Sequence, residues 1–332
     1  MFSTIYIETQ IADHPRTREI CARFPQANRV QCERYGEVFN PKSQDFRLQK
    51  RKPALILAHK HDHHVLETPA GYGIGGQSNY YFSHMLNCLY DCRYCFLQGM
   101  YRSAHHVLYV NYEDFGTDID AILDKAGNEP CWFFSGYDCD SLALEPVSAF
   151  MQHFLPFFAA RPAAHLEVRT KSTQIRSLLK HTAIPNAVVA FSFTPAEIHA
   201  ALEHRVPAIE RRLEAMQTLQ QAGWLLGLRF DPLVYQDNYQ QQYARLFAQV
   251  FSRLDTDRLH SISLGTFRLP RTYFRNIVRL YPDEPLFAGR FAESDGMVSY
   301  PAELEDEMTG FCTRELLKYV PETVLFPCML AA

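Results

Sequence analysis

The sequence predicts an α/β fold, specifically a partial (β/α)6 barrel with an extension at each end. Strand-like and helix-like segments alternate through short links from Asn79 to about Phe267, an order that is typical of a parallel sheet. The alternation gives six strand–helix units, fewer than the eight that close a complete barrel. Reactive residues of such barrels lie at the C-terminal ends of the strands, so a site is expected there.

Six runs within this region have the length and apolar composition of buried strands. We expect strands at residues 80–83, 131–135, 165–170, 187–193, 224–230 and 260–266. The segments between them have helical periodicity, and in the fourth Val206, Ile209, Leu213, Met216 and Leu219 fall on one face. We expect helices at residues 113–125, 145–160, 173–180, 206–222 and 239–254.

The segments before and after the alternating region have different patterns. Residues 1–75 are predicted to form an N-terminal extension with short strand-like runs, and residues 76–268 the barrel. Residues 269–332 are predicted to form a C-terminal extension with an Arg-rich helix, a Pro/Gly-bearing loop and a final helix over residues 301–319.

The composition is that of an ordinary globular protein: of 332 residues, 47% are hydrophobic and 21% are charged. The sequence has no run of eighteen apolar residues, so no membrane-spanning helix is predicted, and Met1–Thr4 lacks a signal-peptide pattern. The nine cysteines are mostly unpaired in spacing, which suits a reducing cytosol and predicts a cytoplasmic protein. A net charge of −4 argues mildly against nucleic-acid binding over a broad surface, but it does not exclude local basic patches.

Three cysteines, Cys88, Cys92 and Cys95, stand in a C-x3-C-x2-C pattern with an aromatic residue directly after the last one. Thiolates hold iron–sulfur clusters, usually four per cluster, so three ligands on a four-iron cube would leave one iron open to a cofactor or substrate. A zinc site would need further ligands, and no C-x2-C or H-x3-H partner follows. Unrelated buried thiols are the other alternative, which fits the scattered cysteines better than this group. The spacing therefore predicts a 4Fe–4S cluster on these three residues.

The C-x3-C-x2-C pattern followed by an aromatic residue resembles the cluster loop of the radical S-adenosylmethionine superfamily. The continuation Tyr94–Gln98, with the runs Ile5–Glu8 and Tyr109–Glu113 and the segment 170–172, resembles the spore photoproduct lyase family of DNA-repair enzymes. The resemblance implies the partial barrel and a second cofactor, S-adenosyl-L-methionine (AdoMet). It implies a 5′-deoxyadenosyl radical that abstracts a hydrogen atom from a UV-induced thymine dimer in damaged DNA. It also implies an external one-electron donor, such as a flavodoxin or ferredoxin, and no membrane.

Two residues match family positions beside the cofactor. Lys171 follows the strand-like segment 165–170, where the family uses a lysine to neutralise the AdoMet carboxylate, and Ser192 ends the next strand near the cofactor. Both stand at strand C-termini, where a barrel site needs them. The alternative for Lys171 is an ordinary surface lysine at a strand end.

The sequence departs from the family pattern where hydrogen is returned to the product. The family's donor cysteine falls at Tyr137 here, and Cys139 stands two residues later. In an extended segment these two side chains would share a face, so either Cys139 or Tyr137 is a candidate donor. Tyr94 is retained as a relay candidate, whereas Phe96 replaces a family tyrosine and removes a hydroxyl. The radical-generating half is therefore expected to be intact and the hydrogen-return half rebuilt.

Two other readings remain open: the same scaffold acting on a different nucleic-acid lesion or base, and a cluster-bearing sensor without turnover. The family's basic DNA-contacting motif is only partly present around Gly289–Phe291, where Met297 replaces an expected lysine. Arg268, Arg271 and Arg290 remain candidate phosphate contacts.

Overall fold

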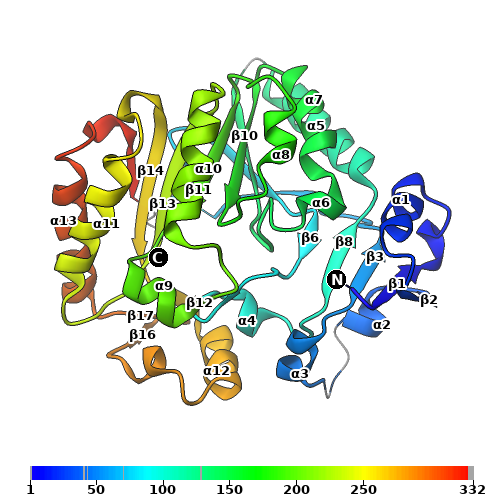
Figure 1. Cartoon of the computed structure of the whole chain (residues 1–332), viewed down its shortest axis with the longest axis horizontal. Coiled ribbons are helices and arrows are strands. Elements are labelled where there is room, and N and C mark those ends of the chain that lie inside the picture. The colour runs from blue at the N-terminus through cyan, green and yellow to red at the C-terminus, as the bar shows by residue number, and fades with distance from the viewer. Residues whose placement is uncertain (1, 40–41, 43, 70, 128, 328–332) are drawn as a thin grey trace.

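The computed structural model describes residues 2–39, 42, 44–69, 71–127 and 129–327, and its centre is a curled eight-stranded sheet (Figure 1). The strand order is β4-β5-β9-β10-β11-β13-β14-β18, and every neighbouring pair is parallel except β4 with β5. The six middle strands follow one another in chain order, which confirms the predicted (β/α)6 partial barrel. The strands are β4 (Val65–Glu67), β5 (Ser78–Phe82), β9 (Cys131–Ser135), β10 (Ala164–Thr170), β11 (Ala187–Ser192), β13 (Leu225–Leu233), β14 (Leu259–Thr266) and β18 (Leu325–Pro327).

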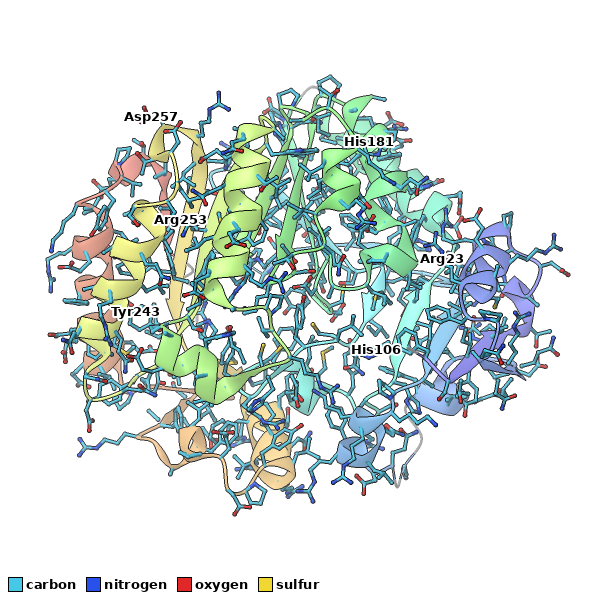
Figure 2. The ribbon with its side chains drawn as sticks, in the orientation of Figure 1. Arg23, His106, His181, Tyr243, Arg253 and Asp257 are labelled. Atoms are coloured by element: carbon cyan, nitrogen blue, oxygen red, sulfur yellow. The ribbon has the colours of Figure 1, made fainter. Side chains whose placement is uncertain are left out.

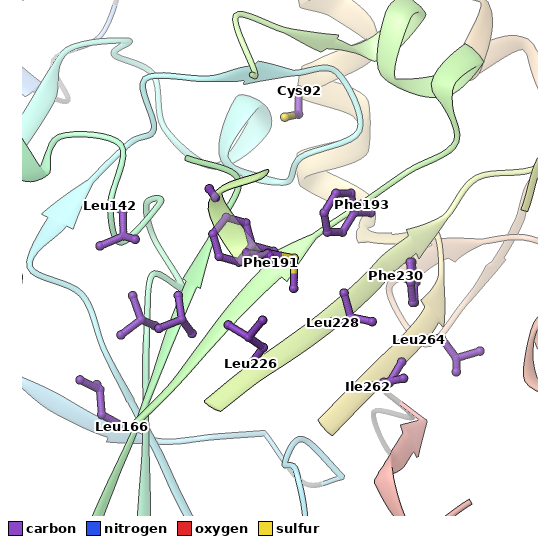
Figure 3. Close-up of a cluster of buried hydrophobic side chains, with 14 of the residues drawn as sticks. Cys92, Leu142, Leu166, Phe191, Phe193, Leu226, Leu228, Phe230, Ile262 and Leu264 are labelled. Atoms are coloured by element: carbon purple, nitrogen blue, oxygen red, sulfur yellow. The ribbon is translucent and has the colours of Figure 1, made fainter. Parts of the chain in front are cut away.

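The strands form because both faces of the sheet are covered. All six side chains of β11 are buried, which is the pattern of a central parallel strand. One face carries an apolar cluster in which Leu166, Phe191 and Leu228 pack with apolar residues of the covering helices (Figure 3). The opposite face, towards the inside of the curl, carries the polar residues of the candidate site.

Among the described residues, seven α-helices lie between His106–Tyr109 and β14, but two of the expected helices differ from the prediction. Residues 145–160 form two helices because Ala149, at φ 50°, ends the first one, and the Glu145 carboxylate accepts the backbone N–H of Met151 in the second. Residues 173–180 contain only one short turn of helix, and α9 was not predicted. The helices are α5 (Tyr112–Ala126), α6 (Glu145–Ser148), α7 (Phe150–Ala159), α8 (Arg176–Leu179), α9 (Ala196–Leu202), α10 (Ile209–Gln221) and α11 (Tyr239–Phe251).

A second sheet lies beside the barrel, in strand order β2-β1-β3-β8-β6. It combines strands from both sides of residue 75, because β6 and β8 come from the segment assigned to the barrel. Its strands are β1 (Thr4–Glu8), β2 (Asn28–Cys32), β3 (Leu55–Ala58), β6 (Met85–Leu86) and β8 (His106–Tyr109), and its helices are α1 (Pro15–Arg23), α2 (Gly36–Phe39) and α3 (Phe46–Arg51).

The C-terminal extension returns to the barrel, since β18 pairs with β14 as the edge of the main sheet. Before that, helix α12 packs against α4 of the cysteine loop, and a small antiparallel sheet of order β15-β17-β16 contacts α12. These elements are α4 (Leu97–Met100), β15 (Arg268–Pro270), α12 (Arg271–Leu280), β16 (Ala292–Ser294), β17 (Met297–Ser299) and α13 (Ala302–Leu316). Within the described ranges, no helix is long and apolar enough to cross a membrane.

Candidate active site

The inner face of the curled sheet carries the polar residues. Along β10 and β13, the apolar residues that face the covering helices alternate with Glu167, Arg169 and Arg229. These three charged residues therefore lie on the inner face. The same alternation places Ser192, at the end of β11, and Lys171, just beyond β10, on the inner side at the C-terminal edge. The strand ends thus bring together the two residues predicted to contact the cofactor.

A buried ion pair braces this inner face. The Arg229 guanidinium donates to both Glu167 oxygens, at 3.2 Å from Nε and 2.7 Å from Nη2, and Nη2 also donates to Ser261 Oγ at 2.9 Å. Both charged side chains are fully buried. Burial alone would raise the pKa of Glu167, but Arg229 and Arg169 lower it to about 2, so the carboxylate is ionised at neutral pH.

The cysteine loop is held in a fixed shape beyond the strand ends. Asn87, at φ 68°, donates from Nδ2 to the carbonyl oxygens of Ser103 and His105, both at 2.7 Å, just before β8, which begins at His106 (Figure 2). The two residues of β7 (Asp91–Cys92) pair with β12 (Glu203–His204), which joins the loop to the segment after β11. Figure 3 shows Cys92 beyond the end of β11, on the side of Phe191 and Phe193.

Cys88, Cys92 and Cys95 line one small cavity of about 30 Å³, together with residues of α3 and α4. The backbone N–H of Tyr90 points at Cys88 Sγ, 3.4 Å away, in the geometry of an N–H···S hydrogen bond. Burial raises the pKa of all three thiols, so their thiolate forms need a compensating cation. Iron would supply that cation.

The grouping of these thiols distinguishes a cluster from a single ion. Thiolates on one Zn²⁺ stand close together because each Zn–S bond is only about 2.3 Å long, whereas cluster thiolates bind different irons. Among the residues that the structure describes, no three His, Cys, Asp or Glu side chains are grouped tightly enough to hold one metal ion. Three thiols around one shared cavity are the arrangement that an iron–sulfur cluster with one open iron needs.

Next to the cysteines, four side chains contact the buried carboxylate of Glu203. The Tyr94 hydroxyl donates to it, His199 Nδ1 lies 2.8 Å away, Arg212 Nη2 3.1 Å and Lys171 Nζ 3.9 Å. Burial opposes ionisation, but Arg212, His199 and Lys171 lower the pKa of Glu203 to about 2. The Lys171 ion pair is longer than a charge-assisted hydrogen bond of about 2.8 Å, which leaves N–H donors for a ligand carboxylate.

A second buried carboxylate, Asp140, fixes the end of β10. It accepts the backbone N–H of Lys171 at 2.6 Å and the Thr170 hydroxyl at 2.7 Å. It also accepts the backbone N–H groups of Leu142 and Ala143, at 3.0 and 2.8 Å. Asp140 thereby ties the loop after β9 to the strand end that carries Lys171.

The sequence prediction missed Glu203, Arg212 and Asp140. Arg212 had a usable signal, because it lies between Ile209 and Met216 on the apolar face of its helix, where a charged residue needs a buried partner. No sequence signal marked Glu203, since it becomes a site residue only through the pairing of β12 with β7.

The structure separates the two candidate hydrogen donors. Gly136, at φ 84°, and the bend after it end the extended conformation of β9, so the prediction that Tyr137 and Cys139 share a face was wrong. Tyr137 is 37% exposed and its ring centroid lies 5.3 Å from that of Phe96. Cys139 is buried in the apolar core of the second sheet, with Sγ 4.0 Å from His84 Nδ1. Only Tyr137 stands beside the cysteine loop at a partly open position.

The candidate phosphate contacts lie on the C-terminal extension. Arg271 is paired with Glu293 at 2.5 Å, and Arg290 lines a cleft of about 1160 Å³ between the end of β13 and the extension. Acidic residues, among them Glu284 and Glu307, line the same cleft, so its charge is mixed. Arg268 lies in β15.

Comparison with known proteins adds an independent observation. The family model described as spore photoproduct lyase matches residues 72–288, more than half of the chain. A spore photoproduct lyase of Clostridium acetobutylicum is 19% identical over 292 residues, covering 86% of this chain and 84% of the relative. The lyase of Bacillus subtilis is 23% identical over 202 residues, covering 60% and 59% of the two chains.

Solved structures agree on the fold. A spore photoproduct lyase mutant with bound AdoMet and dinucleoside spore photoproduct superposes with a TM-score of 0.85 at 17% identity, covering 100% of this chain and 99% of that one. A second mutant of spore photoproduct lyase superposes with a TM-score of 0.87 and the same coverage. The likeness includes the second sheet and the C-terminal extension as well as the barrel.

Proposed function

The chain belongs to the spore photoproduct lyase family, and on this premise we propose that it is a radical AdoMet lyase that reverses a UV-induced thymine dimer in DNA. The observation that supports this best is the three-thiol cavity beside Lys171 at the C-terminal edge of the barrel. A 4Fe–4S cluster with AdoMet supplies one-electron cleavage chemistry and a carbon radical that abstracts hydrogen.

The residues of this chain hold and orient those groups. Cys88, Cys92 and Cys95 would ligate the cluster, and the Lys171 ammonium would neutralise the AdoMet carboxylate, with Ser192 lining the same edge. Glu203 sets the position of Lys171 and, through the Tyr94 hydroxyl, that of the cysteine loop. Because Glu203 and Asp140 are buried and hydrogen-bonded, the geometry is fixed before any ligand binds.

We assign the return of hydrogen to Tyr137. Burial, with Tyr81 and Asp138 nearby, raises the pKa of Tyr137 to about 12, so its O–H is intact at neutral pH. Donation of that hydrogen atom would break the O–H bond, form a C–H bond at the product carbon radical and leave a phenoxyl radical on Tyr137. One further electron from the external donor and one proton from solvent would then restore the tyrosine. Cys139 is the alternative donor, and it would need a movement of the loop to leave its buried position.

DNA is the proposed partner. A lesion inside a duplex must be extruded to reach the barrel, at a cost of a few kcal/mol. Arg268, Arg271 and Arg290 are proposed to contact phosphates on either side, and the aromatic pair Tyr137–Tyr81 to contact the extruded bases. The reducing cytoplasm is the proposed location, because it preserves both the thiols and the cluster.

The tyrosine at position 137 supports a second candidate function. A tyrosine where the family has a thiol, together with Phe96 in place of a hydroxyl, is compatible with the same scaffold acting on a different nucleic-acid lesion or base. The two functions share AdoMet cleavage and differ in the substrate and the product.

The test is anaerobic reconstitution followed by an assay with dithionite, AdoMet and the dinucleoside lesion. We expect about four irons per chain, release of 5′-deoxyadenosine and restored thymine. Cys88→Ala should lose both cluster and activity, whereas Cys131→Ala, a buried cysteine of β9, should keep them. Failure of the reduced protein to release 5′-deoxyadenosine would refute the proposal, and release without restored thymine would favour the second function.

A further inference from the structure

The short helix α3 covers one side of the cysteine cavity. Phe46 and Lys50 line the cavity together with the three cysteines, whereas Lys171, Ser192 and Tyr137 do not. Electrons that entered through α3 would therefore reach the cysteines through a wall of the cavity that Lys171, Ser192 and Tyr137 do not form.

Several contacts fix α3 to the cysteine loop. Lys50 Nζ lies 2.6 Å from Asp91 Oδ1, and Gln49 Oε1 accepts the backbone N–H of Ala104 at 2.8 Å. At its N-terminus, the Asp45 carboxylate accepts the backbone N–H of Leu48 at 2.9 Å. These contacts hold α3 against the cavity, so a partner bound on its outside would lie one helix away from the cysteines.

The outside of α3 carries an exposed apolar side chain among cations. Leu48 is 60% exposed, more than any other large hydrophobic residue that the structure describes. It lies within one helical turn, about 5.4 Å of rise, of both Phe46 and Lys50. We call the surface formed by Arg47, Leu48, Arg51, Lys52 and Arg205 the α3 patch.

The cations of the α3 patch form no ion pair with a described carboxylate. Within the described part of the chain, no ion pair involves Arg47, Arg51 or Lys52. Arg205 donates to the Lys50 carbonyl oxygen at 3.2 Å, which holds its guanidinium at the edge of α3. On α12, by contrast, Glu293 compensates Arg271 and Arg275. Uncompensated cations stand out in a chain whose net charge is −4.

We propose that the α3 patch docks an acidic one-electron carrier protein. The proposal rests on the proposed function, in which the cluster must accept one electron before AdoMet can be cleaved: the carrier is oxidised by one electron and the cluster is reduced by one. An apolar centre with a charged rim is the usual anatomy of a protein–protein contact, and cations around it would steer an acidic partner. A DNA backbone would also be attracted by the cations, but it offers nothing for Leu48 to contact.

The test compares a patch variant with a matched control in the cluster-containing full chain. The patch variant is Leu48→Asp/Arg51→Glu. The control is Leu317→Asp/Lys318→Glu, which makes the same changes at an exposed Leu–Lys pair after α13. Binding of an acidic flavodoxin is measured by anaerobic titration calorimetry, and cluster reduction by stopped-flow absorbance with either reduced flavodoxin or dithionite.

We expect the patch variant to lose tenfold or more in flavodoxin affinity and in the rate of reduction by flavodoxin, roughly the effect of reversing charges in a complementary interface. Dithionite needs no docking, so its rate should not change, and the control should match the unaltered protein. Affinity of the unaltered protein should also fall with added salt.

Unchanged flavodoxin binding in the patch variant would overturn the proposal, as would a loss of duplex-DNA binding without any loss of flavodoxin binding. Failure of the proposed function would be seen separately. In that case dithionite-reduced protein would release no 5′-deoxyadenosine, although the α3 patch would still bind the carrier.

Discussion

Replacing Glu167 by Gln should leave the Arg229 charge buried without its counter-ion. Burial would raise the pKa of Glu167, yet the two arginines lower it from an ordinary 4.5 to about 2. That difference corresponds to about 3 kcal/mol of folding free energy. It agrees with the roughly 3–5 kcal/mol lost when one partner of a buried ion pair is removed.

The effect of pH follows from the same shift. Because the pKa of Glu167 is lower in the folded chain, its stabilisation is fully present above about pH 4.5 and is lost as the pH falls towards 2. The Glu167→Gln variant has no carboxyl group to protonate, so the stability difference between the two proteins should shrink over this interval.

The assay is urea unfolding of reduced, cluster-free protein, monitored by circular dichroism at several pH values. Glu197→Gln is the control, because Glu197 pairs with Arg245 at 2.5 Å on the surface and should cost less than about 1 kcal/mol. Removing both charges, in Glu167→Leu/Arg229→Met, should cost less than Glu167→Gln alone. A loss below 1 kcal/mol for Glu167→Gln, or one independent of pH, would refute this account of the barrel interior.

Two further predictions concern the elements around the site. Gly99→Ala should detach α12 from the cysteine loop, because a Cβ at Gly99 would overlap the Tyr273 carbonyl, and we expect a lower melting temperature and faster cluster loss under oxygen. The control Gly310→Ala, where the nearest atom is the flexible end of Arg314 at 3.4 Å, should be neutral or slightly stabilising, and equal behaviour of both variants would contradict the docking. Tyr137→Phe should keep 5′-deoxyadenosine release but lose most of the restored thymine, as measured by chromatography of the products. If Cys139→Ala shows that loss instead, the donor is Cys139.

The central strands and the grouping of the three cysteines could be predicted from the sequence because their signals are local. A strand buried on both faces must be apolar throughout, as β11 is, and three cysteines in eight residues can reach one centre from a single loop. The break between α6 and α7 could not be predicted from a local signal. It depends on Ala149 adopting a left-handed conformation, which the Glu145 side chain stabilises from six residues before the bonded N–H.

The sequence alone determined the barrel, the grouping of the three thiols and the positions of Lys171 and Ser192 at strand ends, because periodicity and spacing carry that information. Only the tertiary structure decided that Glu203 meets Tyr94, Arg212 and Lys171. It alone separated Tyr137 from Cys139 and placed α3 over the cysteine cavity. Each of these depends on a turn or on a pairing between distant segments, and the energy of such contacts is set by which groups become buried together, which no local pattern records.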